Sequence, residues 1–229
     1  TGGEPLVRKG ILNLIKNLGK KIGNGLDELT LTTNGSQLER YAEFLKENGV
    51  NRVNVSVDHL DPNKFREITR WGDLEIVLAG IEKAKSVGIK VKINTVALKD
   101  FNENNIIEMI EWCSLNEYDM TLIEVMPMGD IGSENRFNQY LPLSKVKEKL
   151  LKKFNLINIP KKTGGPARYY KIEGEKIDLG FITPLTHNFC ESCNRVRLTC
   201  TGILYMCLGQ DNNVDLKNIL RNKGASFLE

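Results

Sequence analysis

The stretch "ELTLTTNGSQLERYAEFLKENGVNRVNVSVD", residues 28–58, decides the fold of this chain. Its two ends, residues 28–35 and 52–58, are rich in β-branched and apolar residues, which is typical of buried parallel strands. Between them, residues 36–49 carry apolar side chains at helical spacing and end in Gly49, a residue that suits a helix C-cap. The stretch therefore predicts a strand–helix–strand unit with a right-handed crossover.

The same alternation continues along the chain. Further strands are expected at residues 90–98 and 120–129, and further helices at residues 8–22, 73–88 and 102–116. This order is typical of an α/β fold with a parallel sheet, in which functional side chains lie at the carboxyl ends of the strands.

The alternation stops after about residue 130. Residues 141–154 then predict a helix, and residues 167–183 a β-hairpin, before the stretch that holds four of the five cysteines. We therefore predict a first α/β domain over residues 1–135 and a C-terminal α+β extension over residues 136–229.

Length and composition limit the class of protein. The 229 residues suffice for one domain with a small appendage, and the net charge of +3 is too small to indicate a nucleic-acid-binding protein. No apolar run approaches the roughly 20 residues of a membrane-spanning helix. Five cysteines without an export signal predict a cytoplasmic protein, in which clustered cysteines bind metal more often than they form disulfides. Because the sequence starts without Met, inside what looks like a motif, we expect a fragment cut at both ends.

The cysteine cluster "FCESCNRVRLTCTGILYMCL", residues 189–208, predicts a metal site. Cys190 and Cys193 form a C-x2-C pair that directs two thiolates at one metal, and Cys207 follows after 13 intervening residues. The spacing fits a structural zinc site, completed by His187 or Cys200, and it also fits an iron–sulfur cluster.

Two arginines inside this cluster favour a ligand beside the metal. Arg195 and Arg197 alternate along an extended stretch, so both would point to one face. Three thiolates on a four-iron cluster leave one iron open, and the planar arginine forks match a phosphate or carboxylate bound there. The alternative is that the arginines only offset the negative charge of the thiolates. At the start of the chain, "TGGEP" adds two glycines that let a backbone approach a ligand closely.

Several motifs occur together in one known family. The segments "TGGEPLVR", "LTTNG", "VNVSVD", "VKINTVAL", "IEVMPMGD" and the cysteine cluster follow the same order as in the GTP 3′,8-cyclases of molybdenum cofactor biosynthesis, and the chain resembles that radical S-adenosylmethionine family over almost its whole length. The resemblance implies an incomplete, TIM-like α/β barrel with a C-terminal extension that carries an auxiliary [4Fe-4S] cluster. It also implies a lyase-type reaction that converts GTP to (8S)-3′,8-cyclo-7,8-dihydroguanosine 5′-triphosphate.

The resemblance further implies three sets of site residues. They are the auxiliary-cluster ligands Cys190, Cys193 and Cys207, the GTP contacts Thr32, Lys92, Arg195 and Arg197, and the S-adenosylmethionine contacts Gly3, Glu4, Ser56 and Met126. Without the family, Lys92 could be an exposed strand-end lysine and Met126 a core residue. Their expected joint position on one rim favours the functional interpretation.

The implied partners are GTP, S-adenosylmethionine, an electron donor and a cyclic pyranopterin monophosphate synthase that acts on the product. Neither nucleic acid nor membrane is implied, and a homodimer is allowed.

A C-x3-C-x2-C motif, which holds the family's second [4Fe-4S] cluster, has no counterpart here, so we expect this stretch alone to be inactive. An open sheet edge is expected to lower its stability. Thr121 replaces an arginine of many members, while Glu124 is retained.

Two alternatives come from other classes. The first is a different radical S-adenosylmethionine enzyme with an auxiliary cluster, such as one that modifies peptides; the two arginines beside Cys193 argue against it. The second is a zinc-stabilised interaction module, and the α/β first part argues against that.

Overall fold

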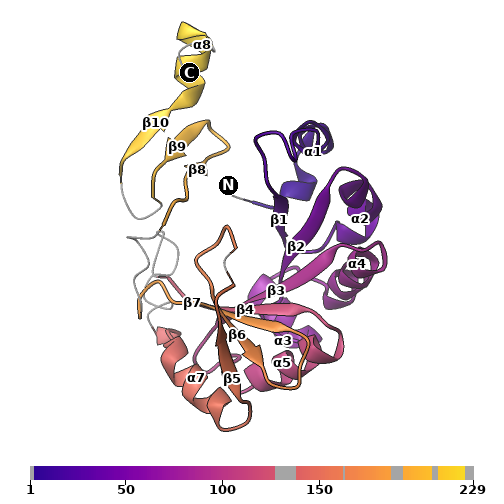
Figure 1. The fold of residues 1–229 in the computed structure, drawn as a ribbon, viewed down its shortest axis with the longest axis vertical. Helices are drawn as coiled ribbons and strands as arrows, with labels where there is room; N and C mark the ends of the chain where they lie inside the picture. The colour runs from indigo at the N-terminus through magenta and orange to yellow at the C-terminus, as the bar shows by residue number, and fades with distance from the viewer. Residues whose placement is uncertain (1–2, 127–137, 162, 187–192, 208–210, 225–229) are drawn as a thin grey trace. The chain divides into compact units, whose positions relative to one another are not determined.

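The computed structural model describes residues 3–126, 138–161, 163–186, 193–207 and 211–224 (Figure 1). The chain divides into two compact units. The larger is Pro5–Asn188, and the smaller combines Thr1–Glu4 with Phe189–Glu229.

The larger unit is built on a seven-stranded sheet of order β1-β2-β3-β4-β7-β6-β5. Its strands are β1 (Leu29–Thr33), β2 (Val50–Ser56), β3 (Lys90–Ala97), β4 (Asp119–Glu124), β5 (Leu156–Ile159), β6 (Arg168–Ile172) and β7 (Asp178–Ile182). Strands β1 to β4 and β7 run parallel to one another, whereas β6 pairs antiparallel with β5 and β7. The described strands do not close into a barrel, since β1 and β5 end the order. The incomplete TIM-like α/β fold is thereby confirmed.

Helices cover one face of this sheet (Figure 1). They are η1 (Pro5–Val7), α1 (Ile11–Gly19), α2 (Leu38–Glu47), α3 (Pro62–Thr69), α4 (Leu74–Ser86), α5 (Ile106–Leu115) and α7 (Leu143–Leu151). Apolar side chains from these helices and from alternate strand positions form the core, as Leu38, Val53 and Ile81 do with no exposure. Side chains that alternate with them point to the other face, which we call the open face.

The predicted helix caps are present. Gly49 and Gly88 follow α2 and α4 with φ of 85° and 81°, the left-handed conformation in which glycine carries no penalty. These caps turn the chain directly into β2 and β3, as the strand–helix–strand interpretation requires.

The smaller unit contains a three-stranded antiparallel sheet of order β10-β9-β8, followed by a helix. Its elements are β8 (Arg197–Leu198), β9 (Ile203–Tyr205), β10 (Asn213–Asp215) and α8 (Leu216–Lys223). None of its residues 193–207 and 211–222 is buried.

All four predicted strands of the first part are present, although residues 127–129 of the last one lie outside the described residues. The predicted hairpin is β6–β7, and it joins the main sheet beside β4. The domain boundary near residue 135 stays a prediction. In the described part of the chain, no helix combines the length and the apolar character that crossing a membrane requires.

Candidate functional site

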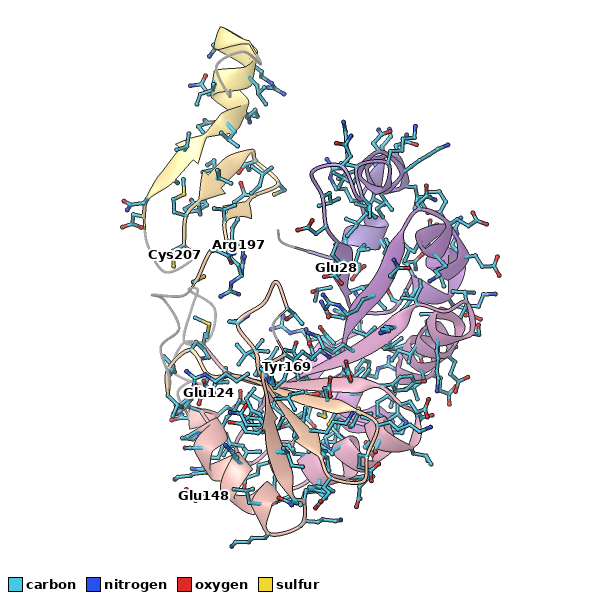
Figure 2. The ribbon with its side chains drawn as sticks, viewed as in Figure 1. Glu28, Glu124, Glu148, Tyr169, Arg197 and Cys207 are labelled. Atoms are coloured by element: carbon cyan, nitrogen blue, oxygen red, sulfur yellow. The ribbon has the colours of Figure 1, made fainter. Side chains whose placement is uncertain are left out.

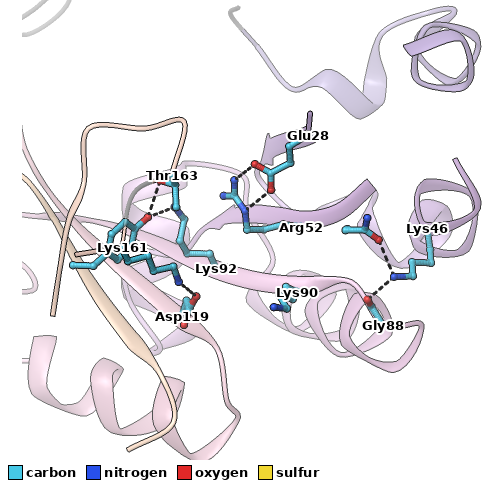
Figure 3. Close-up of a pocket in the computed structure, with 11 residues that line it drawn as sticks. Glu28, Lys46, Arg52, Gly88, Lys90, Lys92, Asp119, Lys161 and Thr163 are labelled. Atoms are coloured by element: carbon cyan, nitrogen blue, oxygen red, sulfur yellow. Dashed lines mark hydrogen bonds and ion pairs between the residues drawn. The ribbon is translucent and has the colours of Figure 1, made fainter. Parts of the chain in front are cut away.

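A pocket of about 420 Å³ opens where β2, β3 and β4 begin (Figure 3). Its charged lining consists of five cations and two carboxylates: Lys46, Arg52, Lys90, Lys92, Lys161, Glu28 and Asp119. The lining therefore carries an excess of positive charge, which suits an anionic ligand.

Lys92 is one of the five cations that line this pocket. It is the third residue of β3, it points to the open face, and it is only 9% exposed. Its Nζ donates to the hydroxyl of Tyr169 at 3.3 Å, and that hydroxyl is 3.2 Å from the Thr163 hydroxyl. A neutral hydroxyl thus holds the ammonium without cancelling its charge.

The position of Lys92 corrects one expectation. It is neither exposed nor at the carboxyl end of its strand, so it does not share the carboxyl rim with Ser56, the last residue of β2. The register explains how it still meets another predicted residue, because Thr32, Asn54 and Lys92 are direct neighbours across β1, β2 and β3. Asn54 Nδ2 donates to Thr32 Oγ1 at 3.2 Å, which links this row.

Each carboxylate of the pocket is paired with a cation other than Lys92. Arg52 forms two hydrogen bonds with Glu28, at 2.8 and 3.1 Å. Lys161 Nζ lies 3.2 Å from an oxygen of Asp119.

Lys161 also lies 2.6 Å from an oxygen of Asp178. Burial lowers the pKa of Lys161, but the hydrogen bond to Asp178 and the charge of Asp119 outweigh it, so the pKa is raised. Lys161 is therefore a permanently charged member of the pocket.

Two buried oxygen atoms lie one row further along the open face. Asn94 Oδ1 and Thr121 Oγ1 have no hydrogen-bond partner among the described residues, and their residues are neighbours in the register of β3 and β4. Ser56 pairs with Asn94 in the same row. Met126, 41% exposed, lies two residues beyond β4 at the same edge of the sheet as Ser56.

Glu124 fastens the end of β4 and is only 1% exposed (Figure 2). It accepts hydrogen bonds from the backbone N–H of Leu143 at 3.0 Å and of Leu185 and Thr186 at 3.2 Å each, and it contacts the Thr186 hydroxyl. A buried carboxylate with several N–H donors fixes backbone segments in place. Glu124 thus joins β4, the start of α7 and residues 185–186.

In the smaller unit, the structure describes Cys193, Cys200 and Cys207 of the cysteine cluster, and the described side chains do not include a group of three or more metal-binding residues. Arg195 Nε lies 3.4 Å from the Cys193 sulfur, and hydrogen bonds from the Arg195 backbone and side chain lower the pKa of that thiol. Strands β8 and β9 pair Arg197 with Tyr205, so the chain segments that carry Cys193 and Cys207 leave the same end of this hairpin. Figure 2 shows Arg197 and Cys207 at that end. Two cysteines at one end of a hairpin, one of them with a lowered pKa, are compatible with two ligands of one metal.

The other predicted ligands differ in their placement. Cys200 lies in the turn at the opposite end of the β8–β9 hairpin, so the register separates it from Cys193 and Cys207. Cys190 and His187 lie outside the described residues.

The two residues predicted at the start of the chain also belong to the smaller unit. Gly3 has φ of 68°, and a side chain there would meet nothing within 4 Å, while Glu4 is half-buried. The space beside the Gly3 backbone is therefore open among the described residues, and its contact with S-adenosylmethionine stays a prediction.

Sequence comparison gives the family context. Residues 1–113 match the family model for the Radical SAM superfamily, and residues 118–228 match that for Molybdenum Cofactor Synthesis C. A GTP 3′,8-cyclase of Rhizobium etli is 61% identical over 221 residues, and one of Brucella ovis is 62% identical over 222 residues. Over 96% of its length the chain is thus similar to proteins named GTP 3′,8-cyclase, and its two halves match the Radical SAM and the Molybdenum Cofactor Synthesis C models.

These relatives are longer than this chain, which spans less than two thirds of their length. The aligned stretch is 96% of the chain in both cases, but only 63% of the Rhizobium etli protein and 64% of the Brucella ovis protein. Among solved structures, Streptococcus suis SuiB bound to S-adenosylmethionine superposes with a TM-score of 0.64 at 16% identity, over 99% of this chain and 55% of SuiB. At that identity, the likeness supports the radical SAM fold alone.

Proposed function

We propose that the full-length protein to which this chain corresponds is a radical SAM GTP 3′,8-cyclase. It would convert GTP to (8S)-3′,8-cyclo-7,8-dihydroguanosine 5′-triphosphate in molybdenum cofactor biosynthesis, a lyase-type reaction. Identity of 61–62% to proteins of that name supports this activity. The observation in the structure that carries it is the cationic pocket around the buried Lys92.

The residues of the larger unit would bind the nucleotide by its charge. Lys92, held by a neutral hydroxyl, supplies a cation for the triphosphate, and Thr32 lies in the same row of the open face. In this unit, Ser56 and Met126, at the carboxyl edge of the sheet, would contact S-adenosylmethionine. In the smaller unit, the proposed S-adenosylmethionine contacts are Gly3 and Glu4. A thioether such as Met126 provides a soft, adaptable surface for an adenine.

The smaller unit would hold the auxiliary [4Fe-4S] cluster through Cys190, Cys193 and Cys207. The lowered pKa of Cys193 suits this role, because a thiolate is the ligand form of cysteine. Arg195 and Arg197 would bind the anionic substrate beside that cluster. S-adenosylmethionine and a second [4Fe-4S] cluster would supply the radical chemistry, which requires an electron donor. A cyclic pyranopterin monophosphate synthase would use the product, and a homodimer is compatible with these roles.

The test is an anaerobic reconstitution of the full-length protein with iron and sulfide, followed by EPR of the reduced clusters with and without GTP. We expect a four-iron signal that shifts on addition of GTP, and no shift in that signal with Cys193→Ala and Cys207→Ala variants. Lys92→Met should weaken GTP binding in equilibrium dialysis. Lys16→Met removes an exposed lysine of α1 and serves as the matched control.

Two outcomes would overturn the proposal. Protein that holds zinc without iron or sulfide would favour an interaction module. Protein that holds iron but does not bind GTP would favour a different radical SAM reaction.

A further inference from the structure

Lys92 and Asp119 face each other across the sheet. They are register partners of the parallel strands β3 and β4, where neighbouring strands lie about 4.8 Å apart and paired side chains point to the same face. Opposite charges at such positions are expected to pair. Nevertheless, the ion pairs formed by the described residues do not include Lys92, whose ammonium contacts the Tyr169 hydroxyl instead.

Lys161, rather than Lys92, forms the ion pair with Asp119. It contacts Asp119 at 3.2 Å and Asp178 at 2.6 Å, from the segment that follows β5. Asp178 has a second cation, Lys171, at 3.5 Å, whereas Lys161 is the cation that pairs with Asp119 within the described part of the chain. The other carboxylate oxygen of Asp119, Oδ1, accepts a hydrogen bond from the Asp178 backbone N–H at 2.9 Å.

Residues 161 and 163 also contact Tyr169, whose hydroxyl accepts the hydrogen bond from Lys92. Thr163 contacts the Tyr169 hydroxyl, and the Lys161 ammonium lies 5.0 Å from the centre of the Tyr169 ring. Lys161 therefore neutralises the Asp119 carboxylate beside Lys92. Thr163 helps to place the Tyr169 hydroxyl that accepts from Lys92.

We propose that Lys161 is a positioning residue that keeps Asp119 from pairing with Lys92, and thereby leaves the Lys92 ammonium for the triphosphate of GTP. The inference rests on the proposed function, and it adds the reason why the pocket binds a phosphate chain. A carboxylate next to Lys92 would compete with phosphate for the same ammonium and would repel the phosphate as well.

The experiment compares Lys161→Met, Asp119→Asn and the double variant in the full-length protein, with GTP, guanosine and inorganic tripolyphosphate as probes in equilibrium dialysis. Loss of one charge contact in a partly buried site corresponds to a change of roughly ten-fold in affinity. Lys161→Met should weaken GTP and tripolyphosphate binding by about that factor and leave guanosine binding unchanged. Adding Asp119→Asn should restore affinity, because the amide still accepts from Asp178 N–H but no longer pairs with Lys92.

The controls separate this role from a structural one. Lys161→Arg should bind GTP like the parent, and Lys176→Met, which breaks an ion pair with Glu117 outside the pocket, should also leave binding unchanged. If Lys161→Met weakened the binding of GTP, guanosine and tripolyphosphate equally, or if adding Asp119→Asn did not restore GTP affinity, Lys161 would act through the fold. Either result would overturn the inference.

The two proposals fail in different ways. A parent protein that binds tripolyphosphate but not GTP would refute the cyclase function while leaving the comparison of Lys161 and Asp119 valid. A parent that binds GTP, with affinity unaffected by Lys161→Met, would refute the inference alone. A parent that binds neither probe would refute both.

Discussion

Asp58 illustrates how burial changes the chemistry of a single carboxylate at the carboxyl edge of the sheet. It lies two residues beyond the end of β2, and its Oδ1 accepts from the Val96 backbone N–H at 2.8 Å. Burial raises the pKa of Asp58, and the Val96 hydrogen bond only partly opposes this. In the pH range between the ordinary aspartate pKa and the raised one, the folded protein therefore binds more protons than the unfolded chain.

This excess of bound protons fixes the sign of a pH effect. Stability falls as pH rises through the raised pKa, because the folded state must then hold a poorly solvated charge. We expect Asp58→Asn to remove that loss, so that its thermal midpoint exceeds that of the parent above the raised pKa and not below the ordinary one. The thermal midpoint of the full-length protein, measured from pH 3.5 to 8, tests this expectation. The pKa of an aspartate in the unfolded chain is about 3.9. Asp27→Asn, at an exposed position, is the control, and an identical pH profile for Asp58→Asn and the parent would contradict the expectation.

At this scale the sequence predicts some site residues and misses others. Lys92 and Thr32 lie in recognisable strand motifs, so they could be predicted. Tyr169 and Lys161 could not, because their role depends on a strand pairing far along the chain; Lys92 and Tyr169 are 77 positions apart. Single-sequence patterns carry no information on which strand β7 joins.

At the scale of elements, periodic segments could be predicted and short ones could not. The long strands and helices repeat apolar residues at fixed spacing, which fixes their type. Helix α3 starts at Pro62 with a single buried residue, Phe65, and strands β8 to β10 have only two or three residues each. Such elements depend on tertiary contacts more than on local pattern.

Helix α4 provides a test of local capping. Asp73 accepts from the backbone N–H of Glu75 at 3.0 Å and of Ile76 at 3.4 Å, as an N-cap residue does. We expect Asp73→Ala to lower the free energy of unfolding by about 1 kcal/mol, and Asp73→Ser to retain most of it. The midpoint of urea unfolding of the full-length protein measures both. Equal midpoints for the Ala and Ser variants would show that the cap does not stabilise the fold.

At the scale of the whole molecule, the two units differ in what orders them. The larger unit has an extensive buried core, whereas residues 193–207 and 211–222 of the smaller unit include no buried side chain. Small units without a core commonly depend on a bound metal for their order. Cysteine spacing predicts a metal site in the smaller unit, and that stays a prediction. The lack of buried side chains could not be predicted from the spacing, because burial is a property of packing.

Removal of iron should therefore affect the two units differently. We expect limited proteolysis of chelator-treated full-length protein to cut within residues 193–224 and to spare Pro5–Asn188, while protein reconstituted with iron and sulfide resists at both. Mass spectrometry of the fragments locates the cuts. Equal resistance of residues 193–224 with and without iron would show that this unit is ordered by protein contacts alone.

The order of the sheet also has a consequence for synthesis of the chain on the ribosome. Strand β7 pairs with β4 although β5 and β6 lie between them in sequence, and Tyr169 on β6 completes the pocket that Glu28 begins. Strands β1 to β4 can pair as they emerge, but the anion pocket does not exist until the β6–β7 hairpin has been translated and has docked. A ligand of this pocket therefore cannot bind the nascent sheet of β1 to β4, and it can stabilise only a chain whose translation has passed this hairpin.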